Sequence, residues 1–410
     1  MGSSDHLLTS IEICAGAGGQ AIGLHKALFK HLALVEIDEH ACSTLEENAV
    51  KRQAWPDCQV VKMDVKDFVG SEQLAGLPVG NEENGKKKGE LDLLAGGVPC
   101  PPFSHAGKQL GKDDERDLFP VMLDLVKHLK PKAVMIENVR GIRDSKFDGY
   151  RADVVKKLED LKYVKCEWDV LEAHHFGVPQ LRPRAILVAI RQDVLERAES
   201  RGVKFVWPTP TVTAPVTAAA ALETSMGRRL ELLKKSFPEY SLQADEAFAH
   251  WWNKSYRGGV APTLVGGSKK HGGADLGPSR AKAAWKSLGI NGLGVANVME
   301  ECLPERDFLT DSGPMLTVSQ AAIIQGFDEE WEFSGGKTAQ YRQVGNAFPP
   351  PVAEAVGRAI SDVLRAAEPG FSDRVECDEE RIPSARFAVD SELVPATADS
   401  NGDRERAFVG

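Results

Sequence analysis

The stretch Ile11–Gly19, IEICAGAGG, sets a short apolar run directly before a glycine-rich turn. Gly16, Gly18 and Gly19 would let the backbone approach a ligand at the N-terminus of the helix that follows. Glu36 comes about twenty residues later, where nucleotide-binding folds place a carboxylate that accepts hydrogen bonds from ribose hydroxyls. The same pattern also fits a nicotinamide-dinucleotide fingerprint or a tight turn without a ligand. It indicates a nucleoside site without deciding between these alternatives.

Apolar runs and amphipathic segments alternate along the first half of the chain. Further apolar runs occupy residues 33–35, 59–61, 91–95, 133–136 and 185–190. Helical periodicity separates them, as at 118–129, and the first helix should extend from the glycine turn to Lys30. Such alternation predicts an α/β, Rossmann-like fold, with a mostly parallel sheet and helices on both faces.

Four parts are expected along the chain. Proline, glycine and tryptophan interrupt the alternation after Gln192, and helical periodicity returns at 318–324 and 352–364. The expected parts are an α/β domain over 1–191, a smaller domain over 192–314, a return to the first domain over 315–367, and an acidic, disordered tail over 368–410.

Charge is distributed unevenly over the 410 residues, whose formal net charge is −10. From Glu368 onward, eleven acidic and five basic residues give −6, whereas Trp251–Ile290 holds seven basic residues and one acidic residue, which gives +6. A basic segment of this kind can contact nucleic acid despite the acidic total. The seven cysteines form no C-x-x-C pair and no long apolar segment is present. We therefore expect reduced thiols, a cytoplasmic, nucleoid-associated location and no membrane contact.

Cys100 lies in the stretch GGVPCPPFSHAGK, directly after the fourth apolar run. Open parallel sheets place their chemistry at the carboxyl ends of strands. Pro99, Pro101 and Pro102 restrict the backbone around the thiol, whereas structural cysteines are usually packed in a core. The pattern favours a reactive thiol over an inert one.

Two further groups of polar residues end or open apolar runs. Glu137 ends the fifth run, so it should lie near Cys100 if the two strands are neighbours. Gln180, Arg182 and Arg184 alternate before the sixth run and should point to one side of an extended segment. A solvated edge strand is the alternative for these three residues.

Together these residues resemble the cytosine-5 DNA methyltransferases, over most of Ile11–Leu364. The similar segments are Glu12–Gly19 (methionine site), Glu36 (ribose), Asp64 (adenine), Gly97–Cys100 (nucleophile loop), Glu137–Val139 (base-binding carboxylate), Gln180-x-Arg182-x-Arg184 (arginine motif) and Arg342–Ala347 (closing motif). Three positions depart from the family: Cys14 replaces a usual Phe, Ile37 an aromatic residue and Ala347 a frequent Ser. No departure removes a reacting group.

The resemblance implies a chemistry in which a thiolate adds to carbon 6 of a flipped-out cytosine, so that carbon 5 takes a methyl group from S-adenosyl-L-methionine. The implied catalytic residues are Cys100, Glu137, Arg182 and Arg184, the two arginines holding the ring oxygen and a flanking phosphate. The implied cofactor residues are Cys14, Gly16, Gly18, Gly19, Glu36, Ile37, Asp64, Val65, Pro99 and Asn346. The implied contacts to the target base and DNA are Val98, Ser104, Gln180, Thr263, Leu264, Lys269, Lys270 and His271.

The smaller domain would read double-stranded DNA. Its stretch Arg257–His271, RGGVAPTLVGGSKKH, resembles the family's target-recognition segment, with Thr263-Leu264 as the family's Thr-Leu pair. Lysines there can read guanine edges, or the segment is a flexible basic loop that touches only phosphates. The resemblance further implies a bacterial restriction-modification role, with a cognate endonuclease acting independently, and we expect a monomer without a metal.

Three other functions were weighed. A transfer-RNA cytosine-5 methyltransferase shares the core motifs but dispenses with a long recognition domain, so the roughly 120 residues after Gln192 favour DNA. A non-catalytic nucleic-acid binder on the same fold would have no reason to keep Cys100, Glu137 and the arginine pair together. A nicotinamide dehydrogenase leaves the loop around Cys100 unexplained.

Overall fold

The computed structural model describes residues 7–52, 54–80, 89–99, 117–266 and 274–369. All of these residues belong to one compact unit. The expected disordered tail, from Gly370 onward, lies outside the described residues.

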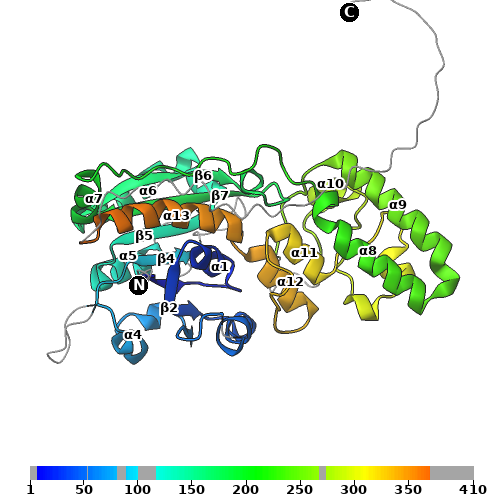
Figure 1. The fold of residues 1–410 in the computed structure, drawn as a ribbon, viewed down its shortest axis with the longest axis horizontal. Helices are drawn as coiled ribbons and strands as arrows, with labels where there is room; N and C mark the ends of the chain where they lie inside the picture. The colour runs from blue at the N-terminus through cyan, green and yellow to red at the C-terminus, as the bar shows by residue number, and fades with distance from the viewer. Residues whose placement is uncertain (1–6, 53, 81–88, 100–116, 267–273, 370–410) are drawn as a thin grey trace, which may run out of the picture. The chain divides into compact units, whose positions relative to one another are not determined.

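A seven-stranded sheet is the centre of the fold (Figure 1), with the strand order β3-β2-β1-β4-β5-β7-β6. The strands are β1 Leu8–Ile13, β2 Phe29–Glu36, β3 Gln59–Lys62, β4 Leu93–Gly97, β5 Ala133–Val139, β6 Tyr163–Glu172 and β7 Pro183–Arg191. Neighbouring strands are parallel except where β7 pairs antiparallel with β5 and with β6. The predicted α/β fold with a mostly parallel sheet is confirmed.

Strand β6 is an element that the apolar runs did not predict. It lies at the edge of the sheet, and Tyr163 and Trp168 are buried while Lys165 between them is exposed. An edge strand with one solvated side carries no continuous apolar run. Five of the six apolar runs belong to interior strands of the sheet, and the remaining one belongs to the short edge strand β3.

Helices cover both faces of the sheet. The α-helices are α1 Gly19–Lys26, α2 Glu39–Leu45, α3 Val65–Phe68, α4 Glu72–Gly76, α5 Phe119–Leu129, α6 Asp148–Asp160, α7 Gln192–Glu199, α8 Ala218–Ser236, α9 Ser241–Gly258, α10 Ser279–Ser287, α11 Val318–Gln325, α12 Lys337–Asn346 and α13 Pro350–Ala367. Short 3₁₀ or π-helical turns occupy Glu46–Lys51, Arg140–Arg143, Ser145–Phe147, Ala173–Phe176, Pro238–Tyr240, Met299–Glu301 and Pro304–Phe308. None of the helices in the described ranges is long and apolar enough to cross a membrane.

Alternate residues of β5 show how the two faces are filled. Val134 and Ile136 pack into a core with α5 and α6, whereas Ala133 and Met135 pack into a core with α1, α7 and α13. All four are at most 1% exposed. Side chains of a strand point alternately to the two faces, so a strand covered on both sides reads as a continuous apolar run.

The first helix is shorter than expected. α1 ends at Lys26, and Lys30 lies in β2 rather than in the helix. Leu28, between them, has a φ of 68°. This left-handed residue reverses the chain, so the helix cannot continue.

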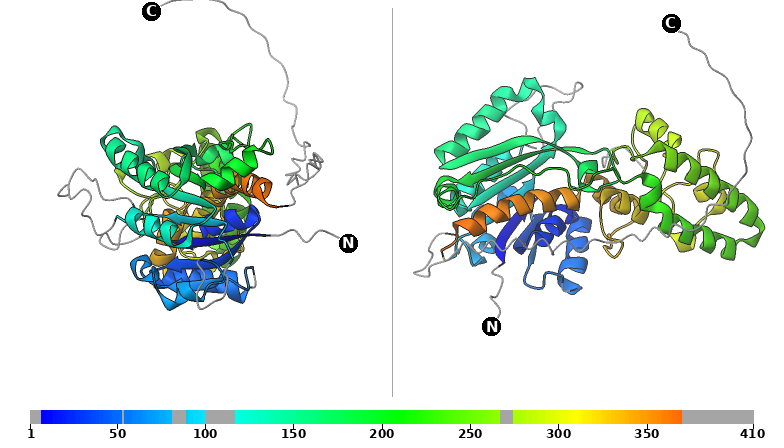
Figure 2. Two further views of the ribbon diagram at one scale, coloured as in Figure 1. Left: turned by 90° about the vertical axis from the view of Figure 1, so that its left-hand side faces the viewer. Right: turned by 45° about the horizontal axis from the view of Figure 1, so that its top comes forward.

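Helices α8, α9 and α10 lie beyond the sheet (Figures 1 and 2). Trp251 and Trp285 are fully buried there, in a core that also contains Leu264 and Tyr341. The long α8 and α9 were not predicted from the sequence. The domain boundaries remain a prediction.

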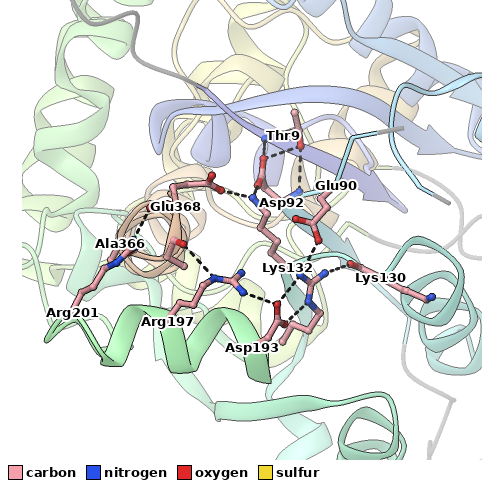
Figure 3. A network of polar contacts seen from close by, with 12 residues as sticks. Thr9, Glu90, Asp92, Lys130, Lys132, Asp193, Arg197, Arg201, Ala366 and Glu368 are labelled. Atoms are coloured by element: carbon pink, nitrogen blue, oxygen red, sulfur yellow. Dashed lines mark hydrogen bonds and ion pairs between the residues drawn. The ribbon is translucent and has the colours of Figure 1, made fainter. Parts of the chain in front are cut away.

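Charged residues fasten the end of α13 to the sheet (Figure 3). Thr9 donates from its backbone nitrogen and its Oγ1 to Asp92 Oδ2, at 2.7 and 2.9 Å. Lys132 pairs with Asp92 at 2.8 Å and with Glu368, and Arg201 donates to the last carbonyls of α13. These contacts hold the returning helix across β1, β4 and β5.

Candidate active site

A cavity of about 260 Å³ lies where four strands end. Its walls come from the ends of β1, β2, β4 and β5, from the glycine turn and from the end of α12. Residues lining it include Glu12, Cys14, Gly16, Gly19, Gln20, Glu36, Gly97, Glu137 and Asn346. The structure thus brings Glu137 to the same cavity as half of the predicted cofactor residues.

The three glycines of the turn have different surroundings. Gly16 has a φ of 54°, and a Cβ there would meet no protein atom within 4 Å. A Cβ on Gly18 would lie 2.9 Å from Leu45 Cδ2, and a Cβ on Gly19 would clash with the carbonyl oxygen of Phe348. Gly16 therefore borders open space in the cavity, whereas Gly18 and Gly19 allow close packing of the protein itself.

Glu36 holds the turn in place. Its Oε2 accepts from the backbone nitrogen of Gly16, and its Oε1 from those of Ile37 and Asp38, all at 2.8 Å. A carboxylate offers about four acceptor positions, so these three bonds leave one for a further donor. Ile37, directly after it, is 64% exposed.

The predicted adenine residues follow the neighbouring strand. Asp64 accepts from the backbone nitrogen of Lys66 at 3.0 Å and begins α3, while Val65 is buried. The backbone nitrogen of Met63 donates to Glu36 O at 2.9 Å, so the two strand ends adjoin. Asp64 and Val65 do not line the cavity itself.

The floor of the cavity contains two polar side chains without partners. Glu12 is fully buried and Gln20 is 5% exposed, and no described residue hydrogen-bonds to either carboxylate oxygen or to the Gln20 amide. Burial raises the pKa of Glu12 to about 8 and lowers that of His31, 3.4 Å away, to about 3. Both groups are therefore neutral at pH 7, and a cationic group nearby would favour ionisation of Glu12.

Glu137 and Arg184 form an ion pair at the cavity wall. Arg184 Nε lies 2.8 Å from Glu137 Oε1, and the two side chains are 12% and 13% exposed. Burial raises the pKa of Glu137, although the charges of Arg184 and Arg182 oppose the shift. Raised pKa values of this kind suit a carboxyl group that acts as a hydrogen-bond donor.

The nucleophile loop starts beside this pair. A Cβ on Gly97 would lie 3.0 Å from Glu137 Oε2, and Asn138 Nδ2 donates to Val98 O at 2.9 Å. Pro99 is exposed, whereas the Val98 side chain is only 2% exposed and packs in the core. Cys100 and Ser104, and likewise Lys269, Lys270 and His271, lie outside the described residues.

Arg182 has surroundings quite unlike those of Arg184. It is 1% exposed, and Nη1 donates to Gln180 Oε1 and Leu264 O at 3.2 and 2.8 Å. Nη2 donates to Gly345 O and Ala347 O at 2.7 and 3.0 Å. This placement differs from the expected contact with a base or phosphate, because both Nη atoms are committed to the protein.

Gln180, predicted as a contact to the target base or DNA, is buried in the same way. Its Nε2 donates to Ile324 O and Gln325 Oε1, at 3.1 and 2.7 Å, and its Oε1 accepts from Leu264 N at 2.9 Å. The exposed residue of this segment is Leu181. The alternation predicted for the arginine motif is present, but it directs Gln180 and Arg182 inward.

The recognition segment runs alongside the arginine motif. Ala261 forms a β-bridge with Gln180, and Thr263 Oγ1 donates to Leu181 O. Leu264, expected at the DNA, is only 1% exposed, because its side chain packs in the core of the helical part. Thr263 remains partly exposed.

Gln20, Asp38 and Arg342 line the cavity but were not predicted as site residues. Arg342 Nη2 lies 3.1 Å from Asp38 Oδ2, which joins α12 to the end of β2. The sequence signal that could have indicated Gln20 as a site residue is a polar glutamine in the first turn of α1, which is buried. The Asp38–Arg342 pair spans some 300 positions, so no local pattern indicates it.

Comparison with known proteins agrees with this architecture. Residues 8–362 match the family model described as C-5 cytosine-specific DNA methylase. The Type II methyltransferase M.NaeI of Lentzea aerocolonigenes is 45% identical over 372 residues, which cover 90% of this chain and 79% of that protein. The Type II methyltransferase M.NgoMIV of Neisseria gonorrhoeae is 43% identical over 360 residues, covering 87% and 98%.

A solved structure supports the fold. A prophage-encoded E. coli protein named as a DNA modification methyltransferase superposes with a TM-score of 0.53 at 20% identity, covering 87% of this chain and 99% of that one. The family match spans the sheet, the cavity and the helical part together. This chain belongs to the C-5 cytosine-specific DNA methylase family.

Proposed function

We propose that this S-adenosylmethionine-dependent DNA methyltransferase uses Cys100 as its nucleophile and Glu137, oriented by Arg184, to activate a flipped-out cytosine in a specific duplex sequence. The observation that carries the proposal is the position of the Glu137–Arg184 pair. It shares a cavity with the glycine turn, and Gly97, where the loop to Cys100 begins, lies beside Glu137.

The cavity fits S-adenosylmethionine in its donor set. The cofactor supplies a methyl group on a positively charged sulfur. Glu12 and Gln20, both buried without partners, would bind the amino-acid end, and the remaining acceptor position of Glu36 would take a ribose hydroxyl. Exposed Ile37 would pack against adenine, with Asp64 as its polar contact. Cys14, Gly18, Gly19, Val65, Pro99 and Asn346 complete the proposed site.

Cytosine is a weak nucleophile at carbon 5, and the residues here would change that. The Cys100 thiolate forms a bond to carbon 6 with its electron pair, and the ring double bond delivers a pair to carbon 5. The raised pKa of Glu137 favours protonation of its carboxyl group, which can then donate to ring nitrogen 3 and offset the negative charge that develops. Once carbon 5 has used this pair to bond the methyl group, a base removes the proton at carbon 5, which restores the double bond and expels the thiolate.

Arg184 would orient Glu137 through their ion pair and place positive charge near the ring oxygen and the thiolate. Arg182 has a different task in our proposal. Since its two Nη atoms are bonded to carbonyl oxygens, it positions neighbouring segments and does not bind the base.

Residues 192–314 would form the recognition domain. Base chemistry on a duplex requires the target to be flipped out of the stack, and the basic stretch Trp251–Ile290 supplies charge for the phosphates. Thr263, Lys269, Lys270 and His271 are proposed DNA contacts. Because M.NaeI and M.NgoMIV are Type II methyltransferases, we place the chain in a restriction-modification system whose endonuclease acts independently of this monomer.

The function is tested by mapping modified cytosines in DNA from a methylation-free host that expresses the chain. A duplex with 5-fluorocytosine at the mapped position should then form a denaturation-resistant adduct that requires S-adenosylmethionine. A base can remove hydrogen from carbon 5 as a proton, but it cannot remove fluorine as a cation, so the thiolate is not expelled. Cys100→Ala should form none, with Cys166→Ala as the matched control that still does. A wild-type protein that methylates the site without trapping would refute the covalent mechanism.

A further inference from the structure

Arg182 lies between two sites that the proposed function keeps separate. Its guanidinium donates to the carbonyl of Leu264 in the recognition segment and to the carbonyls of Gly345 and Ala347 at the end of α12. Asn346 and Ala347 line the cofactor cavity. One buried side chain therefore joins the segment proposed to read DNA to a wall of the cavity proposed to bind the cofactor.

The recognition segment is bonded directly to the arginine motif at Leu264. Both backbone polar groups of Leu264 are bonded to the arginine motif, its nitrogen to Gln180 and its oxygen to Arg182. Two residues on, Gly266 packs directly on Gly345, where a Cβ on either glycine would clash with the other segment. A shift of Leu264 would therefore be transmitted to the Gly345–Ala347 turn by contact and by shared hydrogen bonds.

We propose that Arg182 couples DNA recognition to cofactor binding, by holding Leu264 and the cavity wall at Asn346–Ala347 in one mutual position. DNA that binds the recognition segment and favours this position of Leu264 then strengthens cofactor binding. By thermodynamic linkage the cofactor strengthens DNA binding by the same factor. The inference rests on the proposed function, since it takes residues 257–271 as the DNA-reading segment.

Arginine is required here by geometry. Its planar fork presents two Nη atoms, each with two N–H groups, which matches two acceptors on each side. Lysine keeps the positive charge, but its three donors radiate from one atom and cannot satisfy the two segments in the same way. Arg182→Lys should therefore weaken the link while keeping a buried cation.

Arg229 provides a matched control. It is also fully buried, and it donates to Met315 O and Asp307 O, at 2.6 and 2.8 Å, and to Gln320 Oε1 at 3.3 Å. None of these acceptors lies in the recognition segment or lines the cofactor cavity. Arg229→Lys thus makes the same chemical change with a similar loss of hydrogen bonds.

The test measures the dissociation constant of S-adenosylhomocysteine by calorimetry, with and without a saturating duplex that carries the mapped methylation site. We expect the duplex to tighten binding in the wild type by roughly 5- to 150-fold, the usual range for coupled sites. The ratio should fall to within about twofold of one in Arg182→Lys and stay at the wild-type value in Arg229→Lys. Thermal unfolding should shift similarly in the two variants.

Three results would overturn the coupling: a wild-type ratio of one, an unchanged ratio in Arg182→Lys, or an equal loss in Arg229→Lys. Should Arg182→Lys fail to fold, Gly266→Ala tests the same link from the other side, because its Cβ would press on Asn346. That variant must also reduce the ratio. Binding is measured without turnover, so the result is independent of whether Cys100→Ala upholds the covalent mechanism.

Discussion

Replacing Glu12 by glutamine should stabilise the protein more as the pH rises. The pKa of this buried carboxyl is raised from 4.5 to about 8 because burial disfavours its charged form. Between these values the folded protein binds a proton that the unfolded chain has released. The contribution of this bound proton to the free energy of unfolding is fully present below pH 4.5 and is lost as the pH rises through about 8.

The magnitude follows from the width of that interval. Each pH unit costs about 1.4 kcal/mol, so between pH 5 and pH 7 the wild type should lose about 2.7 kcal/mol through Glu12. Glutamine has a similar shape and the same neutral charge as the protonated acid, so this loss disappears in Glu12→Gln. His31, whose pKa is lowered, gains stability with pH below its ordinary value, but it is present in both proteins and cancels in the comparison.

The assay is urea unfolding of wild type and Glu12→Gln at pH 5 and pH 7 in the same buffer ions. The difference in unfolding free energy between the two proteins should grow by about 2.7 kcal/mol over this interval. Gln20→Leu, which removes an equally buried group that does not titrate, should change stability by the same amount at both pH values. Parallel pH profiles for wild type and Glu12→Gln would refute the assignment of a neutral buried Glu12.

Three other perturbations have defined outcomes. Glu36→Ala and Asp64→Ala should both weaken binding of S-adenosylhomocysteine in calorimetry. The effect of Glu36→Ala should be the larger, because it also removes the hydrogen bond that holds the Gly16 turn. Unchanged affinity in both variants would mean that the adenosine site lies elsewhere. Gly23→Ala should destabilise the protein by about 1–3 kcal/mol in denaturant unfolding, since its Cβ would overlap the start of α13; equal stability would show that α1 can shift. Truncation after residue 369 keeps the Glu368–Lys132 pair and should preserve methylation. Because it removes acidic charge, it should strengthen non-specific DNA binding in low salt. Weaker binding would mean that the tail contributes to DNA binding.

Much of the molecule could be predicted from local patterns. The apolar runs identified six of the seven strands, and the glycine turn with Glu36 located one wall of the cavity. Both signals are local, because a strand covered on two faces must be apolar along its length and a tight turn next to a ligand needs glycine. The motifs of the family, read in order, were sufficient to predict the fold and the class of enzyme, and the family match confirms both.

The sequence by itself predicted the reacting groups and which strand ends carry them, but it did not determine the directions of individual side chains. Gln180, Arg182 and Leu264 belong to recognisable motifs, yet only tertiary packing decided that they are buried against one another. Their partners lie from about 80 to 165 positions away, and no local pattern encodes such contacts. The same holds for Glu12, whose raised pKa arises from desolvation by its surroundings, because burial is a property of the whole packed core and of no single stretch of chain.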